Sequence, residues 1–269
     1  MAGNWIVRHG AMRFLGEFDA EGGDYTRGAE VVVRTERGLE LGQVLCEATP
    51  QTVQSLTEPT RGRLVRVLTE QDRAERERIR AAEGGELEAC GGFVDQRRLQ
   101  MELVDVEHLF GGERIVFYFL AEKRVDFRDL VKDLARQYQT RIEMRQIGVR
   151  DEAKLLADYG DCGKPVCCNT HMSVMPPVSM RMAKLQKSTL DPSKISGRCG
   201  RLKCCLRFEQ DVYEEFQEAL PPVGVRVLTA KGQGRVLAQE VLARRVLVEF
   251  EDGRRIPVAA AEILTRLGA

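Results

Sequence analysis

The stretch QMELVDVEHLFGGERIVFYFLAEKRVDFRDLVKDLARQYQTRIEMRQIG, residues 100–148, decides the fold class that we expect. Apolar and polar residues alternate over MELVDVEHLF, a Gly-Gly pair marks a turn, and RIVFYFLAE reads as a second strand. FRDLVKDLARQY then has apolar residues at helical spacing, and TRIEMRQIGV reads as a third strand. This β-β-α-β order predicts a sheet with one helix packed on it.

The residues before this stretch predict a β-rich N-terminal unit followed by a long helix. Residues 27–49 contain the β-branched run Val31 to Val33, a turn at Glu36-Arg37-Gly38 and a second apolar run. Residues 69–90 are charged and helix-prone, with Ile79 nearly the only large apolar side chain before Leu87. We expect this helix to be solvated or to face a partner.

The C-terminal tail after Pro221-Pro222 alternates apolar and polar residues and turns repeatedly. This pattern predicts a small antiparallel, barrel-like sheet. The fold class expected for the whole chain is therefore α+β. We expect four domains. They are a β-rich N-terminal part at residues 1–68, a helix with a β-β-α-β layer at 69–159, a Cys-rich cluster-binding segment at 160–220 and a small β module at 221–269.

Composition excludes several classes of protein. The chain has 269 residues, 41 basic and 41 acidic, so binding to a polyanion would need a local basic patch. We find no apolar run long enough for a membrane span and no signal peptide, and therefore expect a cytoplasmic protein. In a reducing compartment, clustered cysteines indicate metal or redox chemistry rather than disulfides. No catalytic constellation stands out, so we expect no enzyme activity.

Two short blocks hold six of the eight cysteines: CGKPVCC at residues 162–168 and CGRLKCC at residues 199–205. Both have the pattern Cys-Gly-basic-x-x-Cys-Cys, and thiolates are the natural ligands of zinc and of iron–sulfur clusters. Four sulfurs are enough for one zinc ion or one 4Fe-4S cluster. The predicted metal and cofactor ligands are Cys162, Cys167, Cys168, Cys199, Cys204 and Cys205.

The adjacent cysteines limit how such a site is built. Neighbouring side chains point about 100° apart on a helix and about 180° apart on a strand, so both members of a pair do not easily bind one metal. We expect the ligands to be Cys162, Cys199 and one member of each adjacent pair. Which member of each pair is the ligand is left open. A redox thiol pair and simple buried packing are the alternatives. Cys46 is interpreted as a core residue and Cys90 as a bystander.

Charge is segregated around these blocks. Residues 160–207 contain nine basic and two acidic side chains, and residues 208–220 contain five acidic and no basic ones. The basic side chains near the blocks would offset thiolate charge. They also make direct RNA contact through residues 160–207 an alternative function.

Residues 124–168 and 179–209, with the motifs DEAK, CG-x3-CC and KISG-x-CG-x3-CC, closely resemble the bacterial YaaT (also RicT) family. Its members carry the C-terminal domain named after a yeast polymerase suppressor, PSP-one. The resemblance implies a non-catalytic regulatory subunit that binds iron–sulfur clusters through these six cysteines. It also implies YlbF-like and YmcA-like helical partners, and an influence on RNase Y in mRNA processing, sporulation, competence and biofilm formation.

Overall fold

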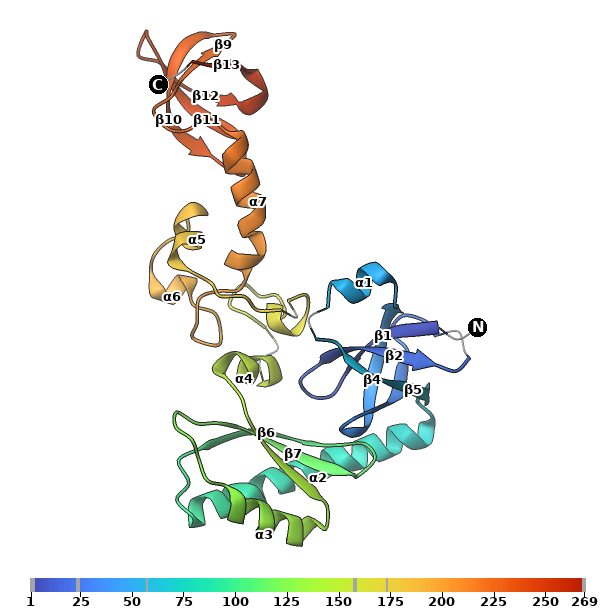
Figure 1. Ribbon diagram of the computed structural model, residues 1–269. Coiled ribbons are helices and arrows are strands. Elements are labelled where there is room, and N and C mark those ends of the chain that lie inside the picture. Colours follow the sequence, from blue (N-terminus) through green and yellow to red (C-terminus); the bar gives the residue numbers. More distant parts are fainter. Residues whose placement is uncertain (1–2, 23–24, 57, 157–158, 173, 268–269) are drawn as a thin grey trace. The chain divides into compact units, whose positions relative to one another are not determined.

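A computed structural model describes residues 3–22, 25–56, 58–156, 159–172 and 174–267 (Figure 1). It contains helices and strands in similar proportion, which confirms the α+β class. The chain divides into two compact units. The first contains residues 1–175 and 198–201, and the second contains residues 176–197 and 202–269. The division into four segments drawn from the sequence stays a prediction.

The first unit begins with a closed five-stranded barrel in the order β1-β2-β5-β3-β4. Its apolar interior includes Val7, Phe18, Val33 and Val44, all fully buried. The predicted hairpin at residues 27–49 is confirmed as β3 and β4. The bounds are β1 Gly3–His9, β2 Phe14–Ala20, β3 Glu30–Thr35, β4 Gly38–Glu47 and β5 Thr60–Val67, with helix α1 at Pro50–Gln54 between β4 and β5.

The β-β-α-β prediction is also confirmed. Strands β6, β7 and β8 form a sheet in that order, with β6–β7 antiparallel and β7–β8 parallel. Helices α2 and α3 pack on one face, around Cys90, Ile115, Phe117, Leu130 and Leu134. The bounds are α2 Glu70–Gln96, β6 Glu102–His108, β7 Arg114–Leu120, α3 Arg128–Tyr138 and β8 Arg141–Gln146.

The opposite face of this sheet is buried as well. Val116 and Tyr118 of β7 cluster there with Met12 from the turn between β1 and β2. Both faces of β7 are therefore covered, which explains its nearly continuous apolar sequence RIVFYFL.

Helix α2 is the predicted charged helix, and it continues to Gln96, beyond the expected end at residue 90. Thr69 caps its N-terminus by accepting a hydrogen bond from the backbone of Asp72, whose carboxylate accepts one from the Thr69 backbone in return. Cys90 and Val94 on its C-terminal half are buried against the sheet, so this half is a core element.

The second unit contains short helices, a longer helix α7 and an antiparallel sheet in the order β12-β11-β10-β9-β13. Val227, Val236, Val246, Val248 and Val258 form the centre of its core. The predicted antiparallel tail is confirmed. The bounds are α5 Met180–Leu185, α6 Pro192–Ile195, α7 Cys205–Ala219, β9 Arg226–Thr229, β10 Gly232–Glu240, β11 Arg245–Phe250, β12 Arg255–Ala259, η2 Ala260–Glu262 and β13 Ile263–Leu267.

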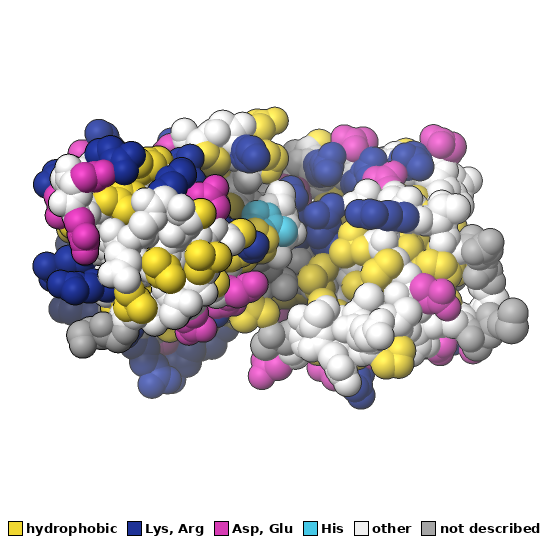
Figure 2. Space-filling model, turned by 90° about the horizontal axis from the view of Figure 1, so that it is seen from above, with side chains coloured by type: hydrophobic (Ala, Val, Ile, Leu, Met, Phe, Trp, Pro, Cys, Tyr) yellow, Lys and Arg dark blue, Asp and Glu magenta, His cyan; other side chains and the backbone are white. Residues whose placement is uncertain are grey.

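Basic, acidic and apolar side chains are interspersed on the face shown in Figure 2. In the described part of the chain, no helix is long and apolar enough to cross a membrane.

Candidate metal centre: two cysteine loops

The first cysteine block is a tight loop that follows helix α4, Val149–Leu156. An isolated antiparallel bridge joins Tyr159 to Pro165 and closes the loop. Inside it, the Gly160 amide donates to the carbonyl of Lys164 at 2.8 Å. Gly163 has φ +75°, a left-handed conformation that an L side chain rarely adopts, so the glycine after Cys162 is required by the turn.

The second block forms the same local structure 37 residues later. A bridge joins Ser196 to Leu202, and Gly200 has φ +71°. These three residues correspond in sequence to Tyr159, Pro165 and Gly163 of the first loop. The sequence repeat is therefore a structural repeat, with each Cys-Gly unit at the tip of a bridged turn.

The cysteine pairs occupy equivalent positions as well. Cys167 and Cys168 begin the 3-10 helix η1, Cys167–Asn169. Cys204 is the N-cap residue of α7, and Cys205 is its first residue. The amide of Asn169 donates to Val166 at 3.0 Å, and the amide of Leu206 donates to Lys203 at 3.2 Å in the second block. Each pair thus starts a helical turn, where adjacent side chains diverge.

The thiols differ in exposure. Cys162 is exposed, and the other five predicted ligands are half-buried. The eight cysteines, all of them described, form no disulfide. Cys162, Cys167, Cys168 and Cys199 belong to the first unit, and Cys204 and Cys205 belong to the second.

No group of three or more His, Cys, Asp or Glu side chains is placed to hold a metal ion among the described residues. The thiols of the two loops are suitable ligands for a thiolate-bound centre. A complete ligand set is not assembled in the described part of the chain. The ligand assignment stays a prediction.

The two remaining cysteines, Cys46 and Cys90, lie in different environments. The interpretation of Cys46 as a core residue is wrong, because its side chain lies exposed near the end of β4. Cys90 is fully buried in α2, and burial raises the pKa of its thiol to about 12. Cys90 is therefore an unreactive core residue, outside both loops in sequence.

Charge around the first loop comes from residues that the cysteine pattern does not reveal. Helix α4 packs against η1, and Lys154 of α4 is half-buried. Burial lowers the pKa of Lys154, while the charges of Asp151 and Cys168 act in the opposite direction. Arg13, in the turn between β1 and β2, donates to the carbonyl of Asn169 at 3.5 Å. The DEAK motif was the sequence signal for Lys154, and no signal pointed to Arg13.

In the second loop, burial raises the pKa of the Cys205 thiol, as do the charges of Cys204 and Glu209, against the effect of Lys203. The Lys203 ammonium donates to the carbonyl of Lys194 at 2.6 Å. Arg207 pairs with Asp211 one turn along α7 at 2.7 Å. The basic segment and the acidic segment thus meet on the first turns of this helix.

The sequence matches two family profiles. One, described as the PSP1 C-terminal conserved region, covers residues 62–147, from β5 to β8. The other, described as the third domain of PSP1-like proteins, covers residues 177–220 and includes the second cysteine loop. These matches show that the chain contains two segments of the PSP1 type.

Individual relatives identify the family more closely. The chain is 42% identical over 239 residues to the stage 0 sporulation protein YaaT of Bacillus subtilis, with 89% of this chain and 86% of that protein covered. The chain belongs to the YaaT family. An uncharacterised protein of Schizosaccharomyces pombe is 34% identical over 41% of this chain, and protein PSP1 of Saccharomyces cerevisiae is 40% identical over 17%. Only 12% and 5% of these two fungal proteins are covered. No solved structure matches.

Proposed function

We propose that this chain is a non-catalytic regulatory subunit that binds an iron–sulfur cluster through its two cysteine loops. The observation that carries the proposal is the structural repeat: two CG-x3-CC blocks form the same bridged turn, each with a left-handed glycine and a cysteine pair that starts a helix. A shared conformation is expected of two halves of one thiolate site, and simple packing of small residues does not require it.

The relative named a stage 0 sporulation protein supports a regulatory role in sporulation or a related process. The resemblance implies that the chain acts in the cytoplasm with YlbF-like and YmcA-like helical proteins. In this proposal, the resulting complex controls mRNA processing by RNase Y, directly or through its partners.

Four of the six thiols would hold the cluster, and Lys154 and Arg13 would lie near its first loop. A cluster with four thiolate ligands carries net negative charge, and cationic neighbours stabilise it. Because the thiols of the two loops are not assembled into a ligand set in the described residues, we propose that the cluster itself brings ligands together.

The test is anaerobic purification followed by iron, sulfide and zinc analysis of the full chain. We expect iron and sulfide in equal amounts, with about four of each for every cluster. Cys162→Ser and Cys199→Ser should lose the cluster. Cys46→Ser is the matched control, because Cys46 is exposed and lies outside both loops. Colourless protein with stoichiometric zinc would establish a structural zinc module instead.

Comparison within each pair decides which thiol is the ligand. Cys167→Ser and Cys168→Ser are measured separately, as are Cys204→Ser and Cys205→Ser. We expect one member of each pair to abolish iron binding and the other to leave it nearly intact, because adjacent side chains diverge at the start of a helical turn. A thiol oxidoreductase would instead contain a cysteine that alkylates faster than a free thiol in metal-free protein.

Direct RNA binding is a second candidate, because the basic segment forms few ion pairs. Of the nine basic side chains in residues 160–207, only Arg207 forms an ion pair with a described residue. Phosphate contacts predict an affinity that falls steeply with salt. Charge reversal at Lys184, Lys187 and Arg201 should abolish binding to single-stranded RNA, and unchanged binding would eliminate this candidate.

A further inference from the structure

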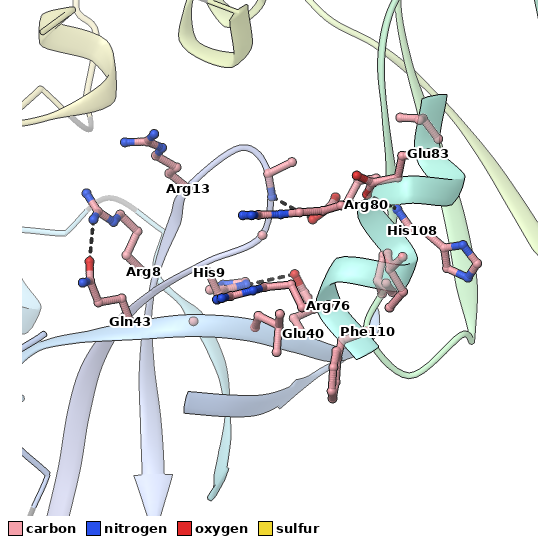
Figure 3. A pocket seen from close by; sticks show the side chains of 18 of the residues that line it. Arg8, His9, Arg13, Glu40, Gln43, Arg76, Arg80, Glu83, His108 and Phe110 are labelled. Carbon is pink, nitrogen blue, oxygen red and sulfur yellow. Dashed lines mark hydrogen bonds and ion pairs between the residues drawn. The ribbon is translucent and has the colours of Figure 1, made fainter. Parts of the chain in front are cut away.

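A cavity of about 460 Å³ lies in the first unit, between the barrel and helix α2. Its walls come from the end of β1, the turn after it, β4, α2, β6 and the residues after β6. Figure 3 shows Arg8 and Arg13 on one side of this cavity, and Glu83 and His108 on the other. The cysteine loops do not line it, although Arg13, which does, also donates to the carbonyl of Asn169 next to the first cysteine pair.

Arg8 and Arg13 give one end of the cavity a positive charge that no described carboxylate neutralises. Arg8 donates to the side-chain oxygen of Gln43 at 2.6 Å, and Arg13 donates to the Asn169 carbonyl at 3.5 Å. Neither forms an ion pair with any carboxylate that the structure describes. Burial lowers the pKa of Arg8, and the like charge of Arg13 lowers it further. An anion between the two guanidinium groups would relieve this repulsion.

The backbone at Arg13 has a conformation that matters for the test of this site. Its φ is +51°, a left-handed conformation that costs free energy for any residue other than glycine. Gly10, in the same turn, also has positive φ and provides the flexibility that the turn needs. Arg98 has the same conformation outside the cavity lining, so this backbone geometry guides the choice of test variant and does not itself indicate a ligand.

Most of the acidic groups around the cavity are already neutralised. Glu30 accepts from Arg73 at 2.8 Å and from Arg76 at 2.6 Å. Glu40 and Glu107 both accept from Arg37. These carboxylates therefore do not oppose an anion at Arg8 and Arg13.

The other end of the cavity has the opposite character. Glu83 and Asp105 line it without an ion-pair partner among the described residues, and burial raises the pKa of both carboxyl groups. The apolar side chains Ile79, Leu109 and Phe110 also line the cavity. This end suits a ligand group with hydrogen-bond donors and some apolar surface.

We propose that this cavity binds a small phosphorylated molecule, with its phosphate between Arg8 and Arg13 and its polar organic part toward Glu83 and Asp105. Guanidinium groups bind phosphate through paired, charge-assisted hydrogen bonds. The volume is that of a small-molecule site, and the unpaired charges at its two ends match a phosphate and a donor-bearing group.

The test is calorimetric titration of the full chain with inorganic phosphate, a nucleoside monophosphate and a sugar phosphate. Arg13→Gly is the informative variant, because it removes the guanidinium and also relieves the left-handed backbone. We expect it to unfold at the same or a higher temperature than the wild type and to bind at least about tenfold more weakly, as loss of one charge-assisted phosphate contact predicts.

Arg98→Gly is the matched control. Arg98 has φ +50° and is exposed just beyond α2, outside the cavity lining, so binding should be unchanged. Arg8→Gln should weaken binding as Arg13→Gly does.

Tighter binding of an organic phosphate than of inorganic phosphate would show that the second end of the cavity is used. Equal phosphate binding by the wild type and Arg13→Gly would overturn the proposal. A chain that binds single-stranded RNA through these arginines but binds none of the small phosphates would overturn it as well. Variants lacking the loop cysteines should bind phosphate normally, which separates this result from the cluster test.

Discussion

Glu107 connects the barrel to the β6–β8 sheet. Its carboxylate accepts hydrogen bonds from the Ala11 amide and from the Tyr118 hydroxyl, both at 2.7 Å, and from Arg37. Arg37 also donates to Glu40 at 3.3 Å, and His9 bonds to Glu40 at 3.1 Å. These side chains are mostly buried, so each depends on its partners for hydrogen bonding.

Glu107→Ala should therefore be strongly destabilising. It leaves the Arg37 charge and the Tyr118 hydroxyl without a partner in a buried site, at a cost of about 3–5 kcal/mol in the free energy of unfolding. Urea denaturation measures this loss. Glu122→Ala, at an exposed position with no ion pair among the described residues, should change stability by less than about 0.5 kcal/mol. Equal effects of the two substitutions would contradict the role assigned to this network.

His108 gives a prediction about pH. Its Nδ1 lies 2.9 Å from a carboxylate oxygen of Glu86, and this hydrogen bond raises the pKa of the imidazole above 6.5. A raised pKa in the folded state stabilises the protein fully below about pH 6.5, and this contribution is lost as the pH rises through the folded value. The free energy of unfolding should fall over that range.

His108→Gln should remove this part of the pH dependence. We expect it to destabilise the chain more at pH 6 than at pH 9, as measured by urea denaturation in two buffers. A His108→Gln profile with the same slope as the wild type would show that other groups carry the dependence.

At the scale of elements, α2 contains four glycines in its 27 residues. A Cβ atom at Gly84 or Gly85 would meet no other atom within 4 Å, and both positions are exposed. Because alanine favours a helix by about 0.5–1 kcal/mol over glycine, Gly84→Ala and Gly85→Ala should each raise the unfolding temperature. Thermal denaturation followed by circular dichroism measures the shift.

Gly62 on β5 provides the contrasting control. A Cβ there would lie 2.2 Å from the carbonyl oxygen of Arg34 on the neighbouring strand β3, so Gly62→Ala should destabilise the barrel. The same substitution thus has opposite signs in α2 and β5. Stabilisation at Gly62 would mean that β3 and β5 are not this close.

Local patterns in the sequence were sufficient for the elements that depend on neighbouring residues. The alternation in β6 and β7 and the helical spacing in α3 predicted the β-β-α-β layer, and Glu36-Arg37 marked the turn from β3 to β4. The closed barrel was not predicted, because closure depends on pairing between β1 and β4 and on the parallel pair β2–β5. These contacts join residues far apart in the sequence, for which periodicity carries no signal.

The candidate site, too, could be predicted only in part from the sequence. The repeated cysteine pattern predicted two equivalent loops, because a glycine after the first cysteine signals a turn. Cys46 was placed in the core on apolar neighbours alone, and the structure shows it exposed near the end of β4. Arg8 and Arg13 gave no signal, because they share the cavity with α2 only after the barrel has closed.

At the scale of the whole molecule, the two family profiles fall in different parts of the architecture. Residues 62–147 cover the last barrel strand, α2 and the β6–β8 layer, and residues 177–220 cover the helices α5 to α7. Neither reaches the sheet β9–β13. This sheet has its own apolar core, from Leu220 to Val258, with no cysteine in it.

Removal of residues 221–269 should therefore leave the iron content of the chain unchanged. The truncation removes contacts such as that of Arg244 over the Phe216 ring, at 3.8 Å, but no predicted ligand. Val248→Asp in the full-length chain tests the same point without truncation, because a charge at this fully buried position disrupts the sheet core. Iron analysis of both variants, with circular dichroism to confirm that the remaining residues are folded, should give the wild-type ratio of iron to chain. Loss of iron from a folded truncated chain would show that the sheet supports the cysteine loops, and the tail would then belong to the proposed cluster-binding part of the protein.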